Sequence, residues 1–155
     1  MEKLGTSILI TCLDEVVGSN LAQQFANFLG LHFACCKEII EYDLFDSGAI
    51  LQKCGAEYFA KREQSVMKDI SRYEDSVIFI NFDLYKNNIK LFKDIHPSIY
   101  LNLPKKKLSV KETVNSIAYD EHSAFLKAKC DIIVDINSAN KSALSKVIKE
   151  INSKL

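Results

Sequence analysis

The chain has 155 residues and no formal net charge, because 20 Lys and Arg residues balance 20 Asp and Glu residues. This balance lacks the basic excess of nucleic-acid-binding proteins and of proteins that bind anionic membranes, so we expect neither partner. No apolar run approaches the ~20 residues that a bilayer span needs, and the N-terminus lacks the apolar segment of a signal peptide. We therefore expect a single cytoplasmic domain, residues 1–155, with one hydrophobic core.

Five cysteines are an odd number, and none of them forms a C-x-x-C pair of the kind found in common zinc and redox sites. They are Cys12, Cys35, Cys36, Cys54 and Cys130. The sequence predicts reduced thiols that pack as small apolar side chains.

The N-terminal third reads as a buried strand over 7–11, a turn, an amphipathic helix over about 20–29 and a second short strand. Apolar residues at Leu21, Phe25, Phe28 and Leu29 follow the spacing of one helix face.

The rest of the chain alternates in the same way. Further strands are predicted at 76–81, 97–103 and 131–136, and further helices at 38–45, 47–54, 55–73, 84–93, 109–128 and after Asn140. Asp83 is the expected N-cap of the helix over 84–93, and Asn140 that of the last helix. Strands that alternate with helices predict an α/β fold of three layers, with a parallel sheet covered on both faces. A ligand should then bind where the strands end, near 12–13, 34–36, 81–83, 102–103 and 135–137.

Four segments in this order resemble shikimate kinase, a small P-loop kinase of the nucleoside-monophosphate-kinase type. They are LAQQFANFLGLHF (21–33), GAEYFAKRE (55–63), YLNLP (100–104) and EHSAFLKAKCDIIVD (121–135). The resemblance implies five parallel strands in the order 2-3-1-4-5 and, for an active member, phosphoryl transfer from ATP with Mg²⁺.

The residues that carry this chemistry do not match. The phosphate-binding pattern G-x-x-x-x-G-K-[ST] falls on CLDEVVGS (12–19). Cys12 and Val17 replace its two glycines, Gly18 replaces the lysine, and Ser19 alone remains. Asp14 and Glu15 add negative charge where a polyphosphate would bind.

The other family positions differ too. Where the family has F-x-D-x-D, this chain has FACCK (33–37). Ala60 and His122 stand where the family has arginines. Asn81-Phe82-Asp83 stands where the family has a glycine triplet. The arginine-bearing lid that the family has after the fourth strand is shortened here to about Lys105–Ser109. We therefore predict a catalytically degenerate member with no cofactor, in which binding of ATP and Mg²⁺ is weak or absent.

Three residues are weak candidates for ligand binding: Ser19, Asp83 and His122. His122 could contact an anionic ligand or be a surface or capping histidine. Asp83 could bind a metal or act as a base, and the N-cap role is the simpler interpretation. A thiolate site formed by Cys12, Cys35 and Cys36 with Asp83 is a further alternative.

Three kinds of function remain open: a non-enzymatic binding or regulatory protein, an enzyme or ligand-binding protein with an atypical site in the same crevice, and an assembly component. The first predicts a small or filled pocket, closed by Leu13, Val16, Val17 and Phe82.

Overall fold

The computed structural model describes residues 7–43, 47–104, 107 and 116–154. Its strands are β1 Ile8–Cys12, β2 His32–Cys35, β3 Ser76–Phe79, β4 Ser98–Asn102 and β5 Ile132–Asp135. Its helices are α1 Glu15–Leu29, α2 Cys36–Asp43, α3 Ser47–Ile70, α4 Phe82–Asn87, α5 Ile89–Phe92, α6 Ser116–Lys129 and α7 Lys141–Lys154. None of the helices in this part of the chain combines the length and hydropathy that a bilayer span requires.

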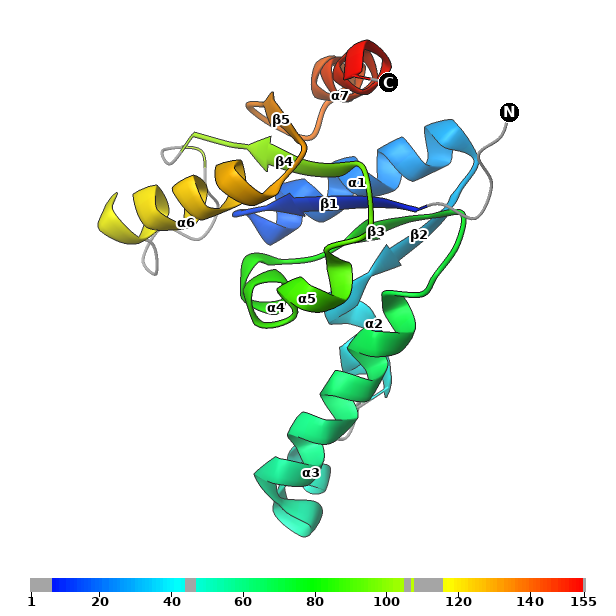
Figure 1. Cartoon of the computed structure of the whole chain (residues 1–155), viewed down its shortest axis with the longest axis vertical. Coiled ribbons are helices and arrows are strands. Elements are labelled where there is room, and N and C mark those ends of the chain that lie inside the picture. The colour runs from blue at the N-terminus through cyan, green and yellow to red at the C-terminus, as the bar shows by residue number, and fades with distance from the viewer. Residues whose placement is uncertain (1–6, 44–46, 105–106, 108–115, 155) are drawn as a thin grey trace.

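The five strands form one parallel sheet in the order β2-β3-β1-β4-β5 (Figure 1). β1 lies in the middle, where Ile10 aligns with Phe79 of β3 on one side and with Ile99 of β4 on the other. Both the predicted fold class and the predicted strand order are confirmed. The carboxyl ends of all five strands consequently meet at one edge, which is where a site was expected.

Each face of the sheet has its own hydrophobic cluster, because neighbouring residues of a strand point to opposite faces. Helices α1 and α7 cover the face that carries Ile10 and Cys12. Helices α3, α4, α5 and α6 contribute to the cluster on the other face, together with Leu9 and Tyr100. The predicted covering of both faces is confirmed.

Helix α1 begins at Glu15, five residues before the predicted start. The backbone amides of Val16 and Val17 donate to the Asp14 carboxylate at 3.0 and 3.1 Å, so Asp14 is the N-cap. The segment predicted as a turn is therefore the first turn of the helix. The sequence interpretation missed this N-cap.

The buried face of α1 also differs from the predicted one. Leu21 and Phe25 are buried, but the exposed fractions of Phe28 and Leu29 are 60% and 41%. The small residues Gly18, Ala22 and Ala26 complete the buried stripe in their place. These small residues turn the contact face away from Phe28, because they let the helix approach the strands closely while Leu21 and Phe25 pack beside them.

Helix α3 is kinked at Gly55, where φ is +88°, which confirms the predicted break between the helices at 47–54 and 55–73. The remaining elements match the prediction with three exceptions. The single helix predicted at 84–93 is divided at Asn88 into α4 and α5. β5 lies at the sheet edge and is buried on one face only, which leaves Ile133 39% exposed. Asp83 is not an N-cap: α4 begins at Phe82, and Asn81 precedes it without a side-chain capping bond. The start of the helix predicted at 109–128 lies outside the described residues, as does most of the shortened lid.

At the amino-terminal ends of the strands, opposite the predicted ligand site, His96 and Asp131 join the starts of β4 and β5. His96 Nδ1 lies 2.6 Å from Asp131 Oδ2, which also accepts the Ser98 amide at 3.0 Å. Burial would raise the pKa of Asp131, but these hydrogen bonds outweigh it and hold the pKa below its ordinary value. His96 is therefore a structural residue far from the crevice.

Close packing of α1 on the sheet yields a prediction at Gly18. A Cβ there would lie 2.5 Å from Cys12 Cβ and 2.6 Å from Phe79 Cε1. We expect Gly18→Ala to lower the free energy of unfolding by about 1–3 kcal/mol, although alanine favours a helix over glycine by about 1 kcal/mol. Urea denaturation measures the change, with Ser19→Ala in the same turn as the control. A Gly18→Ala protein as stable as the wild type would contradict this packing.

Candidate functional site

The connection from β1 to α1 consists of two residues, Leu13 and Asp14. Asp14 stabilises the helix start through its side chain and its backbone. Its carboxylate accepts from the amides of Val16 and Val17, and its carbonyl oxygen accepts from the Gly18 amide at 2.9 Å. Asp14 is only 4% exposed. The eight-residue loop that the family pattern would place on 12–19 is therefore absent from this connection.

This cap changes what the helix N-terminus can bind. Free amides and the positive end of the helix dipole make such a terminus an anion site. Here an internal carboxylate already takes the Val16 and Val17 amides. A phosphate group would have to displace a buried Asp14 and approach the neighbouring Glu15. A lysine at position 18 is excluded as well, because even a Cβ there would overlap Cys12 and Phe79.

A small cavity of about 260 Å³ lies beside this helix start, at the ends of β2 and β3. Its lining residues are Glu15, Val16, Ser19, Cys35, Lys37, Glu38, Glu41, Phe79 and Asn81. It is thus rich in carboxylates, and its one ammonium group, that of Lys37, lies 2.9 Å from Glu15 Oε1. The hydrogen bond with Glu15, followed by the charge of Glu15, raises the pKa of Lys37. The cavity therefore has the wrong sign of charge for a polyphosphate.

One polar atom of a residue that lines this cavity has no partner. The Oδ1 atom of Asn81 is buried and accepts no hydrogen bond within the described part of the chain. A buried amide oxygen without a donor is costly, and its burial keeps it out of reach of a ligand in the cavity.

The three predicted site residues do not form one site. Ser19 lines the cavity from α1, and its hydroxyl donates to the Val16 carbonyl oxygen at 3.4 Å. Asp83 is an exposed residue in the first turn of α4. The His122 ring stacks on Phe82, with the ring centroids 4.0 Å apart. Among the described residues, no hydrogen bond or ion pair joins any two of them, so the sequence identified their positions at the edge but not a shared site.

Most of the residues predicted to fill the crevice do so. Leu13 and Val17 pack against the core, and Phe82 is 9% exposed and stacked on His122. Val16 is the exception, at 65% exposed on the rim of the cavity. Three of the four apolar residues predicted to fill the crevice are therefore at least partly buried.

The cysteines form no thiolate site. Cys12 and Cys35 belong to the cluster on the α1 face, and Cys36 belongs to the cluster on the opposite face. Burial raises the pKa of Cys12 to about 12 and also raises the pKa values of Cys35 and Cys36, so all three are protonated thiols. No group of three or more metal-binding side chains occurs in the described ranges. The alternative of a metal or redox site with Asp83 is wrong for these residues.

The sequence interpretation missed a polar network at the carboxyl ends of β4 and β5. Tyr100 donates to Asn102 Oδ1 at 3.2 Å and accepts from the Ser123 hydroxyl at 3.0 Å, and Asn102 Nδ2 donates to Asp135 Oδ1 at 2.8 Å. Tyr119 donates to the Leu103 carbonyl oxygen at 2.7 Å. Burial raises the pKa of Tyr100, which keeps its hydroxyl protonated as a donor. These groups satisfy one another and hold β4, β5 and α6 together.

Comparison with known proteins identifies the scaffold. The model of the shikimate kinase family matches residues 18–152. The chain belongs to the shikimate kinase family. The match begins at Gly18, so β1 and the Asp14 cap lie outside it. No curated protein sequence matches the chain significantly.

Solved structures agree on the fold. Shikimate kinase from Bacteroides thetaiotaomicron is similar with a TM-score of 0.70 at 15% identity, over 96% of this chain and 97% of that one. Shikimate kinase from Acinetobacter baumannii, solved with shikimate, is similar with a TM-score of 0.67 at 17% identity, over 99% and 96%. Identities this low establish a common fold and leave the chemistry of this chain to its own residues.

The capping interaction gives a prediction at Asp14. Asp14→Ala removes the acceptor of two amides at a buried helix end, so we expect a loss of about 1–2 kcal/mol in the free energy of unfolding. Asp14→Ser, which keeps a capping oxygen, should lose clearly less. Urea denaturation of the two variants measures both values. Equal stability of Asp14→Ala and the wild type would show that the carboxylate is not needed at the helix start.

Proposed function

We propose that this chain is a catalytically degenerate shikimate-kinase-like protein that acts in the cytoplasm as a non-enzymatic binding or regulatory protein. The observation that supports this best is the Asp14 carboxylate on the amides of Val16 and Val17. It occupies, from within the chain, the helix terminus that a kinase of this fold would use for phosphate. We expect no cofactor, no nucleic acid and no membrane as partner.

The charge of the crevice disfavours phosphoryl transfer. Phosphoryl transfer depends on positioning and on cationic groups that neutralise the charge of the transferred group. Here the helix start presents Asp14 and Glu15, and the adjacent cavity adds Glu38 and Glu41. Lys37 is the nearby cation, and Glu15 already pairs with it. Such a site favours neither ATP nor its magnesium-bound transition state.

A second candidate function is a small-molecule kinase or ligand-binding protein that uses an atypical site in the same crevice. The excess of glutamates in the 260 Å³ cavity favours it. Carboxylates select a ligand with hydrogen-bond donors, and preferably a cationic one. This candidate differs from the first in requiring saturable binding of a small molecule at the cavity.

Isothermal titration of the purified chain with Mg-ATP, Mg-ADP and shikimate tests the proposal. We expect no saturable heat with any of them at millimolar concentration, and no ADP release above the background rate in a coupled assay. The Acinetobacter baumannii shikimate kinase, titrated in the same buffer, is the positive control. Thermal stabilisation by the same ligands gives a second readout, because a ligand bound only by the folded state raises the melting temperature.

The two outcomes are distinct. Micromolar binding of Mg-ATP, or turnover with shikimate, would refute the degenerate assignment. Absence of both supports it.

A further inference from the structure

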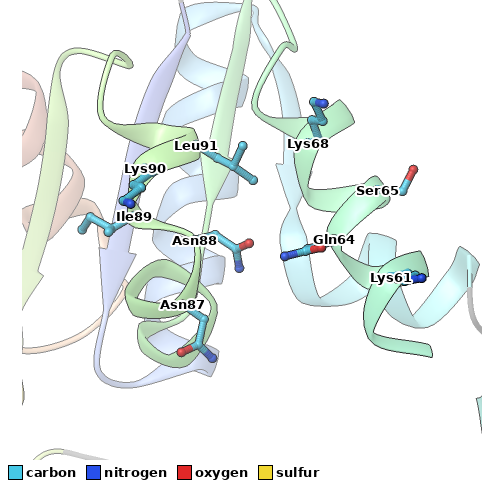
Figure 2. A pocket seen from close by; sticks show the side chains of 9 residues that line it. All are labelled: Lys61, Gln64, Ser65, Lys68, Asn87, Asn88, Ile89, Lys90 and Leu91. Atoms are coloured by element: carbon cyan, nitrogen blue, oxygen red, sulfur yellow. The ribbon is translucent and has the colours of Figure 1, made fainter. Parts of the chain in front are cut away.

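A second and larger hollow lies away from the carboxyl edge, between α3 and the α4–α5 segment. Its volume is about 760 Å³, and its walls are four residues of α3 and five consecutive residues of α4–α5 (Figure 2). This hollow, the lysine groove, is lined by Lys61, Gln64, Ser65, Lys68, Asn87, Asn88, Ile89, Lys90 and Leu91. Ser19, Asp83 and His122 do not line it, so it is separate from the crevice.

The lysine groove carries charge of one sign. Its lining includes Lys61, Lys68 and Lys90 and no carboxylate, in a chain whose net charge is zero. Lys61 lies 3.5 Å from Glu57, an exposed pair that contributes little. Within the described residues, Lys68 and Lys90 have no ion-pair partner. A concave surface with like charges attracts a ligand of opposite charge.

The α3 wall is a regular stripe. Lys61, Gln64, Ser65 and Lys68 follow the i, i+3, i+4, i+7 spacing of a single helix face. The opposite face of the helix, with Val66, Met67 and Ile70, is packed into the core. The stripe is thus a polar face turned towards α4–α5 across the groove.

The chemistry of the groove suits a peptide. Side chains from both walls, Gln64 on one side and Asn88 and Leu91 on the other, point towards each other across it (Figure 2). Amides can pair with both the N–H and the C=O groups of an extended backbone, and Ile89 and Leu91 add apolar contact. Lys61 and Lys68 are seven positions apart, or roughly 10 Å along a helix, which an extended segment of about three residues spans.

Other anions fit less well. No aromatic side chain lines the groove, so a nucleic-acid base has no stacking surface there. The three α3 and α5 lysines are exposed point charges on two walls, without an arginine fork for bidentate binding of a phosphate.

We propose that the lysine groove docks an acidic peptide segment of a partner protein, with the partner's carboxylates on Lys61, Lys68 and Lys90. This names the partner class for the binding role proposed above. It uses none of the residues that argue against catalysis, so the two proposals can fail separately: shikimate turnover would refute the first, and only peptide binding bears on the second.

Fluorescence anisotropy with a labelled hexapeptide, Glu-Leu-Glu-Glu-Leu-Glu, tests the docking. At low salt we expect a dissociation constant below about 1 mM that weakens as salt is added. The double variant Lys68→Gln/Lys90→Gln should bind about tenfold more weakly. The control is Lys141→Gln/Lys149→Gln, which removes the same charge from exposed positions on α7. It should bind within about twofold of the wild type.

Several results would overturn the proposal. If both double variants bind the peptide equally weakly, only the net charge of the protein matters. If Gln-Leu-Gln-Gln-Leu-Gln binds the wild type as tightly as Glu-Leu-Glu-Glu-Leu-Glu does, the peptide carboxylates do not contribute to binding. Tighter binding of a single-stranded DNA oligonucleotide, lost in the groove variant, would assign the groove to nucleic acid. Inorganic tripolyphosphate that binds more tightly than the peptide would assign it to phosphates. Circular dichroism confirms that all variants are folded.

Discussion

The Asp14 carboxylate at the start of α1 is the interaction on which the rest of the crevice depends. It accepts the amides of Val16 and Val17, and its carbonyl oxygen accepts that of Gly18. With these bonds the helix begins two residues after β1, and no loop remains between strand and helix to surround a phosphate. An anion site at a helix terminus requires free amides, so a built-in carboxylate closes it without any change of fold.

Gly18 is the second constraint, and it acts on the same turn. Because it has no side chain, α1 approaches Cys12 and Phe79 closely, and the space that a longer connection would need is filled by core atoms. The two hydrophobic clusters on the faces of the sheet extend up to the crevice, where Cys35 and Phe79 of one cluster line the small cavity and Phe82 belongs to the other. The lysine groove lies outside the crevice, and its apolar lining residues Ile89 and Leu91 also pack against the core cluster of that face.

The sequence predicted the fold well and the site poorly, for a physical reason. The two covered faces and the Asn140 cap follow from apolar patterning and local capping, the strand order follows from the family resemblance, and all are confirmed. The start of α1 was missed because Asp14 was interpreted as a charge near a phosphate and not as an N-cap. The stacking of His122 on Phe82 and the groove between α3 and α5 bring together segments that are distant in the sequence, which no local pattern reports.

The most direct test of the central claim is the response of the Val16 and Val17 amides to nucleotide. A ¹H–¹⁵N NMR titration of the labelled protein with Mg-ATP follows these two signals individually. If Asp14 already occupies their hydrogen bonds, neither signal shifts in a saturable way up to millimolar nucleotide. A saturable shift of both amides, with Asp14 released, would mean that the helix terminus still binds phosphate and that the Asp14 carboxylate does not close it.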